Sequence, residues 1–171
     1  LTLLAANREP LERPLYGSFL GRLAHRLLHL ARANTRTGSR RNIAAHYDLG
    51  NEFYALWLDP TMTYSSALFA GGPARTLEQA QVAKYRRILD ELALPAGASV
   101  LEIGCGWGGF ADVAAREFGA RVTGLTISDE QFAFAKARMQ RNALNDQVDI
   151  RLLDYRDVDG QFDKVASIEM F

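Results

Sequence analysis

The stretch "VLEIGCGWGGFA" at residues 100–111 restricts the fold of this chain more than any other feature. Four glycines fall within six residues, directly after an apolar run and directly before an apolar, Ala-rich run. A glycine turn between a strand and a helix presents bare backbone N–H groups and a helix N-terminus to a ligand. The sequence therefore predicts a ligand-binding loop at 104–109.

Segments with strand and helix patterns alternate along the chain from residue 99 onward. We expect strands at 99–103, 121–127, 148–153 and 162–168, a loop at 154–161, and helices at 108–119 and 129–144, the second capped by Ser128. Strand–helix–strand units of this length form a parallel sheet with right-handed crossovers. The predicted class is α/β, with a Rossmann-like parallel sheet that is incomplete in this chain.

The residues before 95 favour helices over strands. Leucines at steps of three and four predict a helix over 15–33, and the polar "NTRTGSRRN" at 34–42 is typical of a linker. A short helix is expected at about 50–57 and a longer one at 77–93, with Thr76 as its N-cap. We divide the chain into a basic helical arm with its linker (1–41), a helical cover segment (42–94), and the sheet domain (95–171).

Charge is balanced over the chain but not along it. The sequence has 20 basic and 20 acidic residues, yet residues 1–41 hold eight arginines against two glutamates. A basic arm on an acidic body suggests an anionic partner for the arm, whether lipid headgroups, nucleic acid or another chain.

Several classes of site and of location are excluded or disfavoured by composition. Cys105 is the only cysteine, which excludes an internal disulfide and fits a reducing cytosol; without a His base partner nearby in sequence, we interpret it as a small filler residue. His25 and His29 lie four apart without a third ligand, so no metal is predicted. No apolar run approaches the ~18 residues that a membrane span needs. The chain begins with Leu and ends "ASIEMF" like an interrupted strand, so we expect a fragment that lacks a C-terminal half.

The glycine loop fits two classes of ligand. Gly104, Gly106 and Gly109 match the G-x-G-x-x-G pattern of nicotinamide dinucleotide sites, but that reading needs an acid at the end of the second strand, where Thr126 stands. Glu102 instead precedes the loop, and a carboxylate followed by G-x-G-x-G resembles the first motif of S-adenosylmethionine-dependent methyltransferases. A carboxylate suits the ammonium group of that ligand, directly or through water.

Four segments together narrow the resemblance. They are "HYDLGNEFYALWLDPTMTYSSALF" (46–69), "VLEIGCGWGGFA" (100–111), "VTGLTISDEQ" (122–131) and "LLDYRDVDGQFDKVASIEMF" (152–171). In order and spacing they resemble the cyclopropane-fatty-acyl-phospholipid synthase family, which includes mycolic acid cyclopropane synthases and related fatty-acid C-methyltransferases. The resemblance implies a class I methyltransferase fold, of which 95–171 is the first half. It also implies S-adenosyl-L-methionine as cofactor and the cis double bond of unsaturated phospholipid acyl chains as acceptor.

The resemblance also implies roles for residues that match the family's motifs. Tyr64 and Ser65 are expected to lie over the cofactor, and Gly104 and Gly106 to contact its methionine part, in addition to Glu102. Thr126 and Gln131 are expected to hold the ribose. Tyr155 and Arg156 are expected beside the adenine. Each of these residues has a structural alternative as a core aromatic, a turn residue or a solvated charge. A contact from Asp154 to the adenine amine stays open in the same way.

Tyr64 and Ser66 are the expected catalytic residues. The family commonly reads Tyr-Ser-Cys at 64–66, and its Cys contributes to a pocket for a bicarbonate ion, the proposed base; a further Glu of that pocket would follow Phe171. Here the third residue is Ser66, whose hydroxyl can still donate to an anion. Cyclopropane and methyl- or methylene-branched products therefore both stay open, and we expect this chain alone to be inactive.

The expected chemistry and setting follow from the lipid acceptor. Methyl attack on an alkene leaves a carbocation, which the faces of Phe53, Tyr54, Trp57 and Tyr64 could stabilise unless they are core residues. We expect a cytoplasmic protein that binds the inner face of the membrane peripherally through its basic arm and has no nucleic acid partner. A homodimer stays possible. The alternative functions are a methyltransferase with a non-lipid acceptor, a non-catalytic membrane-binding module and a dehydrogenase. His46 is interpreted as a structural residue or, less well, as a base.

Overall fold

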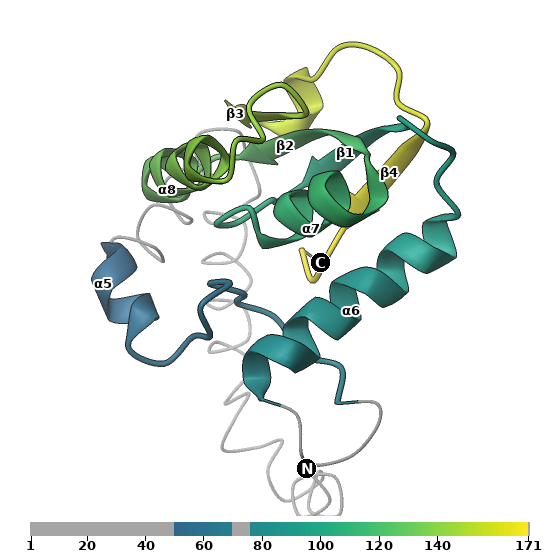
Figure 1. The fold of residues 1–171 in the computed structure, drawn as a ribbon. Coiled ribbons are helices and arrows are strands. Elements are labelled where there is room, and N and C mark those ends of the chain that lie inside the picture. Colours follow the sequence, from purple (N-terminus) through teal and green to yellow (C-terminus); the bar gives the residue numbers. More distant parts are fainter. Residues whose placement is uncertain (1–49, 70–75, 171) are drawn as a thin grey trace, which may run out of the picture. The chain divides into compact units, whose positions relative to one another are not determined.

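The computed structural model describes residues 50–69 and 76–170, and Figure 1 shows its ribbon. These residues belong to one contact unit, Arg40–Phe171. The predicted helix at 15–33, the linker after it, and all three histidines lie outside the described residues. Among the residues that are described, no helix has the length and apolar content that crossing a bilayer requires.

Four parallel strands form the sheet, which confirms the predicted α/β class. They are β1 (Ser99–Ile103), β2 (Arg121–Thr126), β3 (Val148–Leu152) and β4 (Lys164–Ser167), in the order β3-β2-β1-β4. The chain runs outward from β1 to β3 and then returns to the other side of β1 with β4. Open α/β sheets bind ligands at the carboxyl ends of the strands where the order reverses, which is here between β1 and β4.

Two crossover helices lie on one face of this sheet (Figure 1). Helix α7 (Gly109–Phe118) joins β1 to β2, and α8 (Asp129–Arg141) joins β2 to β3. A third helix, α6 (Leu77–Leu92), packs against α7. The largest fully buried side chains of the core come from these elements and from the sheet: Phe110, Leu89, Leu125, Met139 and Ile150. A short helix, α5 (Gly50–Ala55), precedes them.

Capping residues fix where the helices begin, as the sequence predicts. At the start of α6 the Gln79 N–H donates to Thr76 Oγ1 at 3.2 Å, and the Thr76 N–H donates to Gln79 Oε1 at 3.1 Å. The Ser128 hydroxyl accepts from the Gln131 N–H at 3.3 Å at the start of α8. These bonds satisfy N–H groups that have no partner within the helix.

Several predicted segments differ from the structure in extent or in content. Helix α8 ends at Arg141 and not at 144, because Ala143 adopts a left-handed backbone with a φ of 54° that a helix cannot continue. Strand β4 covers only 164–167 of the predicted 162–168. The predicted loop at 154–161 contains a 3₁₀ turn, η1 (Tyr155–Asp157), because the Asp154 carboxylate accepts from the Arg156 N–H at 3.0 Å.

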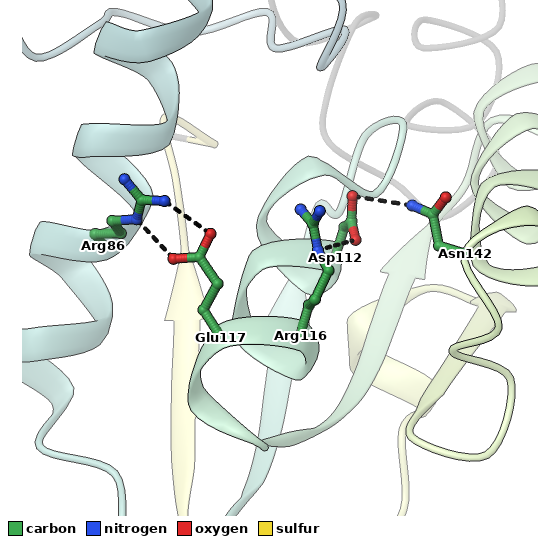
Figure 2. Close-up of polar contacts among 5 residues, drawn as sticks. All are labelled: Arg86, Asp112, Arg116, Glu117 and Asn142. Atoms are coloured by element: carbon green, nitrogen blue, oxygen red, sulfur yellow. Dashed lines mark hydrogen bonds and ion pairs between the residues drawn. The ribbon is translucent and has the colours of Figure 1, made fainter.

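Polar contacts join the outer surfaces of three helices, as Figure 2 shows. The Arg86 guanidinium of α6 donates to both carboxylate oxygens of Glu117 in α7, at 2.6 and 2.9 Å. Asp112 of α7 accepts from Asn142, just after α8, at 3.2 Å and also pairs with Arg116. Exposed pairs of this kind contribute at most about 1 kcal/mol each, so burial of the apolar core contributes more to holding the helices.

Candidate functional site

The glycine loop between β1 and α7 lies at the carboxyl ends of the strands. The N–H groups of Gly104 and Cys105 donate to the Leu125 carbonyl of β2, at 3.0 and 2.8 Å. The loop needs glycine, since Gly104 has a φ of 80° and Gly106 a φ of 53°. The sequence predicts unhindered N–H groups along this loop, and at Gly104 and Cys105 that expectation was wrong because both groups bind β2.

The two glycines expected to contact a cofactor differ in their surroundings. A Cβ atom built on Gly106 would meet nothing within 4 Å, so this side of the loop is open. A Cβ on Gly104 would clash with the sulfur of Met170, which follows β4. Met170 is unbranched and 40% exposed, so it can change rotamer when a ligand approaches the loop.

Glu102 is the most unusual ionisable group of the site. Its side chain is buried, the Ala111 N–H at the start of α7 donates to its carboxyl group, and its Oε2 atom has no partner among the described residues. Burial raises the pKa of Glu102 to about 8, against the smaller opposing effect of the Ala111 N–H. A buried acid with an unpaired oxygen beside an open glycine loop fits a cationic ligand group such as an ammonium.

Cys105 packs inside the loop. It is buried, and burial raises the pKa of its thiol well above the ordinary value. A Cβ atom on Gly124 of β2 would lie 3.1 Å from Cys105 Cβ and 2.9 Å from Ile150 Cδ1. The thiol therefore fills space beside Gly124, where a side chain would have little room, in agreement with its interpretation as a filler residue.

Thr126 and Gln131 lie together at the end of β2. The Thr126 hydroxyl donates to Gln131 Oε1 at 2.9 Å and accepts from the Ser128 N–H at 3.2 Å. All three residues are buried. The structure brings the two predicted ribose contacts into one hydrogen-bonded group, which fixes the turn between β2 and α8.

Tyr155 and Arg156 lie in η1, after β3. Arg156 pairs with both oxygens of Asp154, at 2.8 and 2.5 Å, and its guanidinium lies 5.8 Å from the centre of the Tyr155 ring. This ion pair raises the pKa of Arg156. The Asp154 carboxylate, a candidate acceptor for an adenine amine, is thus already bound by Arg156.

The segment 59–66 covers the loop and is tied to it by Arg138 of α8. The Arg138 guanidinium donates to the carbonyl groups of Thr61 at 2.8 Å, Trp107 at 3.0 Å and Pro60 at 3.1 Å. Asp59 adds local bonds to the Thr61 and Thr63 N–H groups, at 2.9 and 3.3 Å. One buried cation therefore joins the cover segment to the glycine loop, a role that nothing in the sequence pattern of α8 indicates.

The predicted pair Tyr64 and Ser65 lies on this segment, followed by Ser66. Lys84 of α6 donates to the Ser65 hydroxyl, and Gln81 Nε2 donates to the Ser65 carbonyl at 2.8 Å. The Ser66 N–H donates to Glu169 Oε1 at 3.0 Å, and its hydroxyl bonds to the same oxygen. Lys84 and Glu169 were missed by sequence reasoning, since neither stands in a recognisable motif.

The four rings of the expected aromatic set, Phe53, Tyr54, Trp57 and Tyr64, lie close to one another and to Trp107. The Tyr54 ring centre lies 5.7 Å from that of Tyr64 and 5.1 Å from that of Trp107, while Trp57 and Tyr64 are 5.3 Å apart edge to face. Tyr54 is buried, whereas Phe53, Trp57 and Tyr64 expose 41–47% of their surface. Three rings therefore offer surface to an apolar ligand, and Tyr54 supports them from the core.

Comparison with known proteins identifies the family. A family model described as mycolic acid cyclopropane synthetase matches residues 34–171. The chain belongs to this family. A probable fatty acid methyltransferase from Pseudomonas putida is 46% identical to it over 142 residues, which are 82% of this chain and 36% of the relative. The cyclopropane-fatty-acyl-phospholipid synthase of Escherichia coli K12 is 45% identical over 126 residues, 74% of this chain and 31% of that one.

A solved structure shows the same fold. The mycolic acid cyclopropane synthase CmaA1, complexed with SAH and CTAB, is 35% identical and matches with a TM-score of 0.72 over 75% of this chain and 45% of its own. The fold of the described residues is thus the Rossmann-like fold of class I methyltransferases, as the resemblance implies. This chain spans about a third of the length of the two curated relatives.

Residues 50–69 and 76–170 contain no group of three His, Cys, Asp or Glu side chains that could hold a metal ion.

The four segments that suggested the family all lie within the matched range. Their assignment to the cyclopropane synthase family is confirmed, and the individual site residues stay predictions.

Proposed function

We propose that this chain forms the cofactor-binding half of a methyltransferase that acts on the cis double bond of unsaturated phospholipid acyl chains. The observation that carries the proposal is the buried Glu102 carboxyl, which has one oxygen without a partner and stands on β1 directly before the glycine loop. A buried polar atom without a partner is rare in folded proteins and often marks a ligand contact. The SAH bound to the related CmaA1 supports S-adenosylmethionine as that ligand.

The residues present fit the parts of this cofactor. Glu102 would hold the ammonium group, Gly106 the methionine backbone, Thr126 with Gln131 the ribose, and Tyr155 with Arg156 the adenine; Tyr64 and Ser65 would cover it. When bound, S-adenosylmethionine supplies an electrophilic methyl group on a sulfonium. Because the Thr126 and Gln131 side chains already fix one another, little ordering is left to occur when the ribose binds.

The aromatic surface supports an apolar acceptor. The exposed rings of Phe53, Trp57 and Tyr64 would exclude water once an acyl chain covers them, and their π faces favour positive charge. Water exclusion matters because a carbocation on the acyl chain reacts with any water that reaches it. An acyl chain of a membrane phospholipid fits this surface, and a cytoplasmic location with the basic arm on the anionic inner face of the membrane would bring it there.

A second product class is supported by one observation. Glu169 occupies the donors of Ser66, where the family resemblance implies a bicarbonate ion. A base placed differently could remove a different proton. The acyl chain would then carry a methyl branch on a double bond or, after a hydride shift, a methylene branch, in place of a cyclopropane. The name of the P. putida relative, a probable fatty acid methyltransferase, agrees with this alternative.

Two measurements test the proposal. Calorimetric titration of this chain should show binding of S-adenosylhomocysteine and none of NAD; the reverse result would favour the dehydrogenase. The complete reading frame that encodes the chain should transfer label from methyl-labelled cofactor to unsaturated phospholipid vesicles, and mass spectrometry should identify the ring or branch. Binding of S-adenosylhomocysteine without any label in the lipid would leave a methyltransferase with a non-lipid acceptor.

A further inference from the structure

Three separate elements meet at the Ser65–Ser66 peptide. The cover segment supplies the two serines, α6 supplies Lys84, and the chain after β4 supplies Glu169. The Ser66 N–H and hydroxyl both bond to Glu169 Oε1, and the Lys84 ammonium bonds to the Ser65 hydroxyl. The contact between Ser66 and Glu169 joins residues 103 positions apart in sequence.

This group lies at the reversal of strand order. Glu169 follows β4 by two residues, and the carboxyl end of β4 lies beside that of β1. The next residue, Met170, touches the glycine loop at Gly104. Glu169 is therefore held between the loop that is proposed to bind the cofactor and the cover segment that carries Tyr64.

The surroundings of Glu169 are those of an anion site. Ser66 offers two donors aimed at one point, and Lys84 adds a positive charge nearby. Hydrogen bonds from Ser66 lower the pKa of Glu169, with a smaller contribution from Lys84, so the carboxylate is ionised at neutral pH. Desolvation lowers the pKa of Lys84 to about 8 although Glu169 and Asp59 act in the opposite direction.

The backbone at Glu169 is unusual. Its φ of 53° lies in the left-handed region, which glycine adopts freely and a glutamate rarely adopts. Strain of this kind is commonly found at functional sites, where the side chain has a role that outweighs its backbone cost. A glycine at this position would keep the backbone and remove only the carboxylate.

We propose that Glu169 is the proton acceptor of the methylation reaction and occupies, with its own carboxylate, the anion position at Ser66. The inference rests on the proposed function. In that reaction the methyl carbon of the sulfonium would bond to one alkene carbon, and the sulfur would keep the electron pair of the broken S–C bond. Glu169 then takes a proton from the resulting carbocation, either from the new methyl group, whose C–H electron pair closes the ring, or from a neighbouring carbon, whose pair forms a double bond.

Three variants of the complete reading frame test this role. Glu169→Gly removes the carboxylate without backbone strain, Glu169→Gln keeps the size, and Glu91→Gln is a matched control on the exposed surface of α6. Both changes at 169 should lower turnover by about 10²–10⁴-fold, the usual contribution of a general base, and the control should not. Added bicarbonate or formate should restore at least about a tenth of wild-type turnover to Glu169→Gly only, because Gln still fills the site.

A second readout needs neither cofactor nor turnover. Line broadening of ¹³C-labelled bicarbonate or formate should show binding to this chain carrying Glu169→Gly, and no binding to the wild type, whose own carboxylate fills the position. Adding Ser66→Ala to Glu169→Gly should abolish the binding. Circular dichroism establishes that each variant is folded, and Glu169→Gln still tests the role if Glu169→Gly does not fold.

Each outcome decides the inference. Wild-type turnover that depends on added bicarbonate, full turnover by either variant at 169, or equal anion binding by wild type and Glu169→Gly would overturn it while leaving the proposed function intact. Absence of methyl transfer by the wild type would instead reject the proposed function. In that case the anion-binding experiment still reports whether Glu169 fills an anion site.

Discussion

Replacing Glu102 by Gln tests the central electrostatic claim about the site. The Glu102 carboxyl is buried, with one backbone donor and one unpaired oxygen, and its pKa is raised to about 8 by burial. In the unfolded chain the same group has its ordinary value of 4.5. Gln has nearly the same shape but takes up no proton, so the comparison isolates the ionisation of this one side chain.

The size and sign of the effect follow from the two pKa values. Between them the folded protein keeps a proton that the unfolded chain has lost, so this group stabilises the fold fully below the lower pKa and loses that contribution as pH rises through the upper one. The slope is about 1.4 kcal/mol per pH unit. Between about pH 5.5 and about pH 7.5 the free energy of unfolding of the wild type should fall by about 3 kcal/mol relative to Glu102→Gln.

Urea denaturation of both proteins at several pH values in that range measures the difference. Glu117→Gln is the matched control, because Arg86 lowers the pKa of Glu117 and its contribution is lost only as the solution becomes acidic. The difference in unfolding free energy between the wild type and Glu117→Gln should not change with pH across this range. Parallel pH dependences of wild type and Glu102→Gln would refute the raised pKa.

Ligand binding gives the same variant a second readout. An ammonium beside Glu102 should drive the carboxyl to ionise, so binding of S-adenosylhomocysteine near neutral pH should release a proton from the wild type and none from Glu102→Gln. The lost charge-assisted hydrogen bond should weaken binding by about 10- to 100-fold. Calorimetry in buffers of different ionisation enthalpy measures both quantities, and equal affinity with equal proton release would contradict the proposed role.

Two further variants test how the site is held. Arg138→Gln removes the shared donor to three carbonyl groups, so it should lower the free energy of unfolding by about 2–4 kcal/mol and expose the segment 59–66 to proteases. The control Arg141→Gln, at an exposed position of α8, should do neither. Resistance of Arg138→Gln to proteolysis would argue against the tether. Gly124→Ala places a Cβ atom against Ile150 and Cys105 and should cost about 1–3 kcal/mol, so an unchanged urea midpoint would show that this contact can relax.

Local sequence patterns were sufficient for most of the fold. The N-cap residues Thr76 and Ser128 lie within four residues of the N–H groups that they satisfy, so sequence reasoning found both. It failed at Ala143, where the helix ends in a left-handed conformation without the glycine that would have signalled it. The boundary error arises because tertiary contacts around Leu144, a buried residue, decide where the chain leaves α8.

The candidate site divides in the same way. Gly104, Gly106, Thr126 and Gln131 stand in short motifs, and the structure places them at the carboxyl edge of the sheet as the topology requires. No sequence motif indicates the role of Glu169, because its partner Ser66 is 103 residues away. The Ser66 donors, where the resemblance implies a bicarbonate ion, bond to that carboxylate instead.

The sequence by itself determined the order of strands and helices, the glycine loop and the family, since periodicity, turn residues and capping act over a few neighbouring residues. Only the tertiary structure decided that the Glu102 oxygen is buried without a partner, that Arg138 joins the cover segment to the loop, and that Glu169 lies on Ser66. Burial and long-range hydrogen bonds depend on which distant segments the folded chain brings together, and no local pattern encodes that.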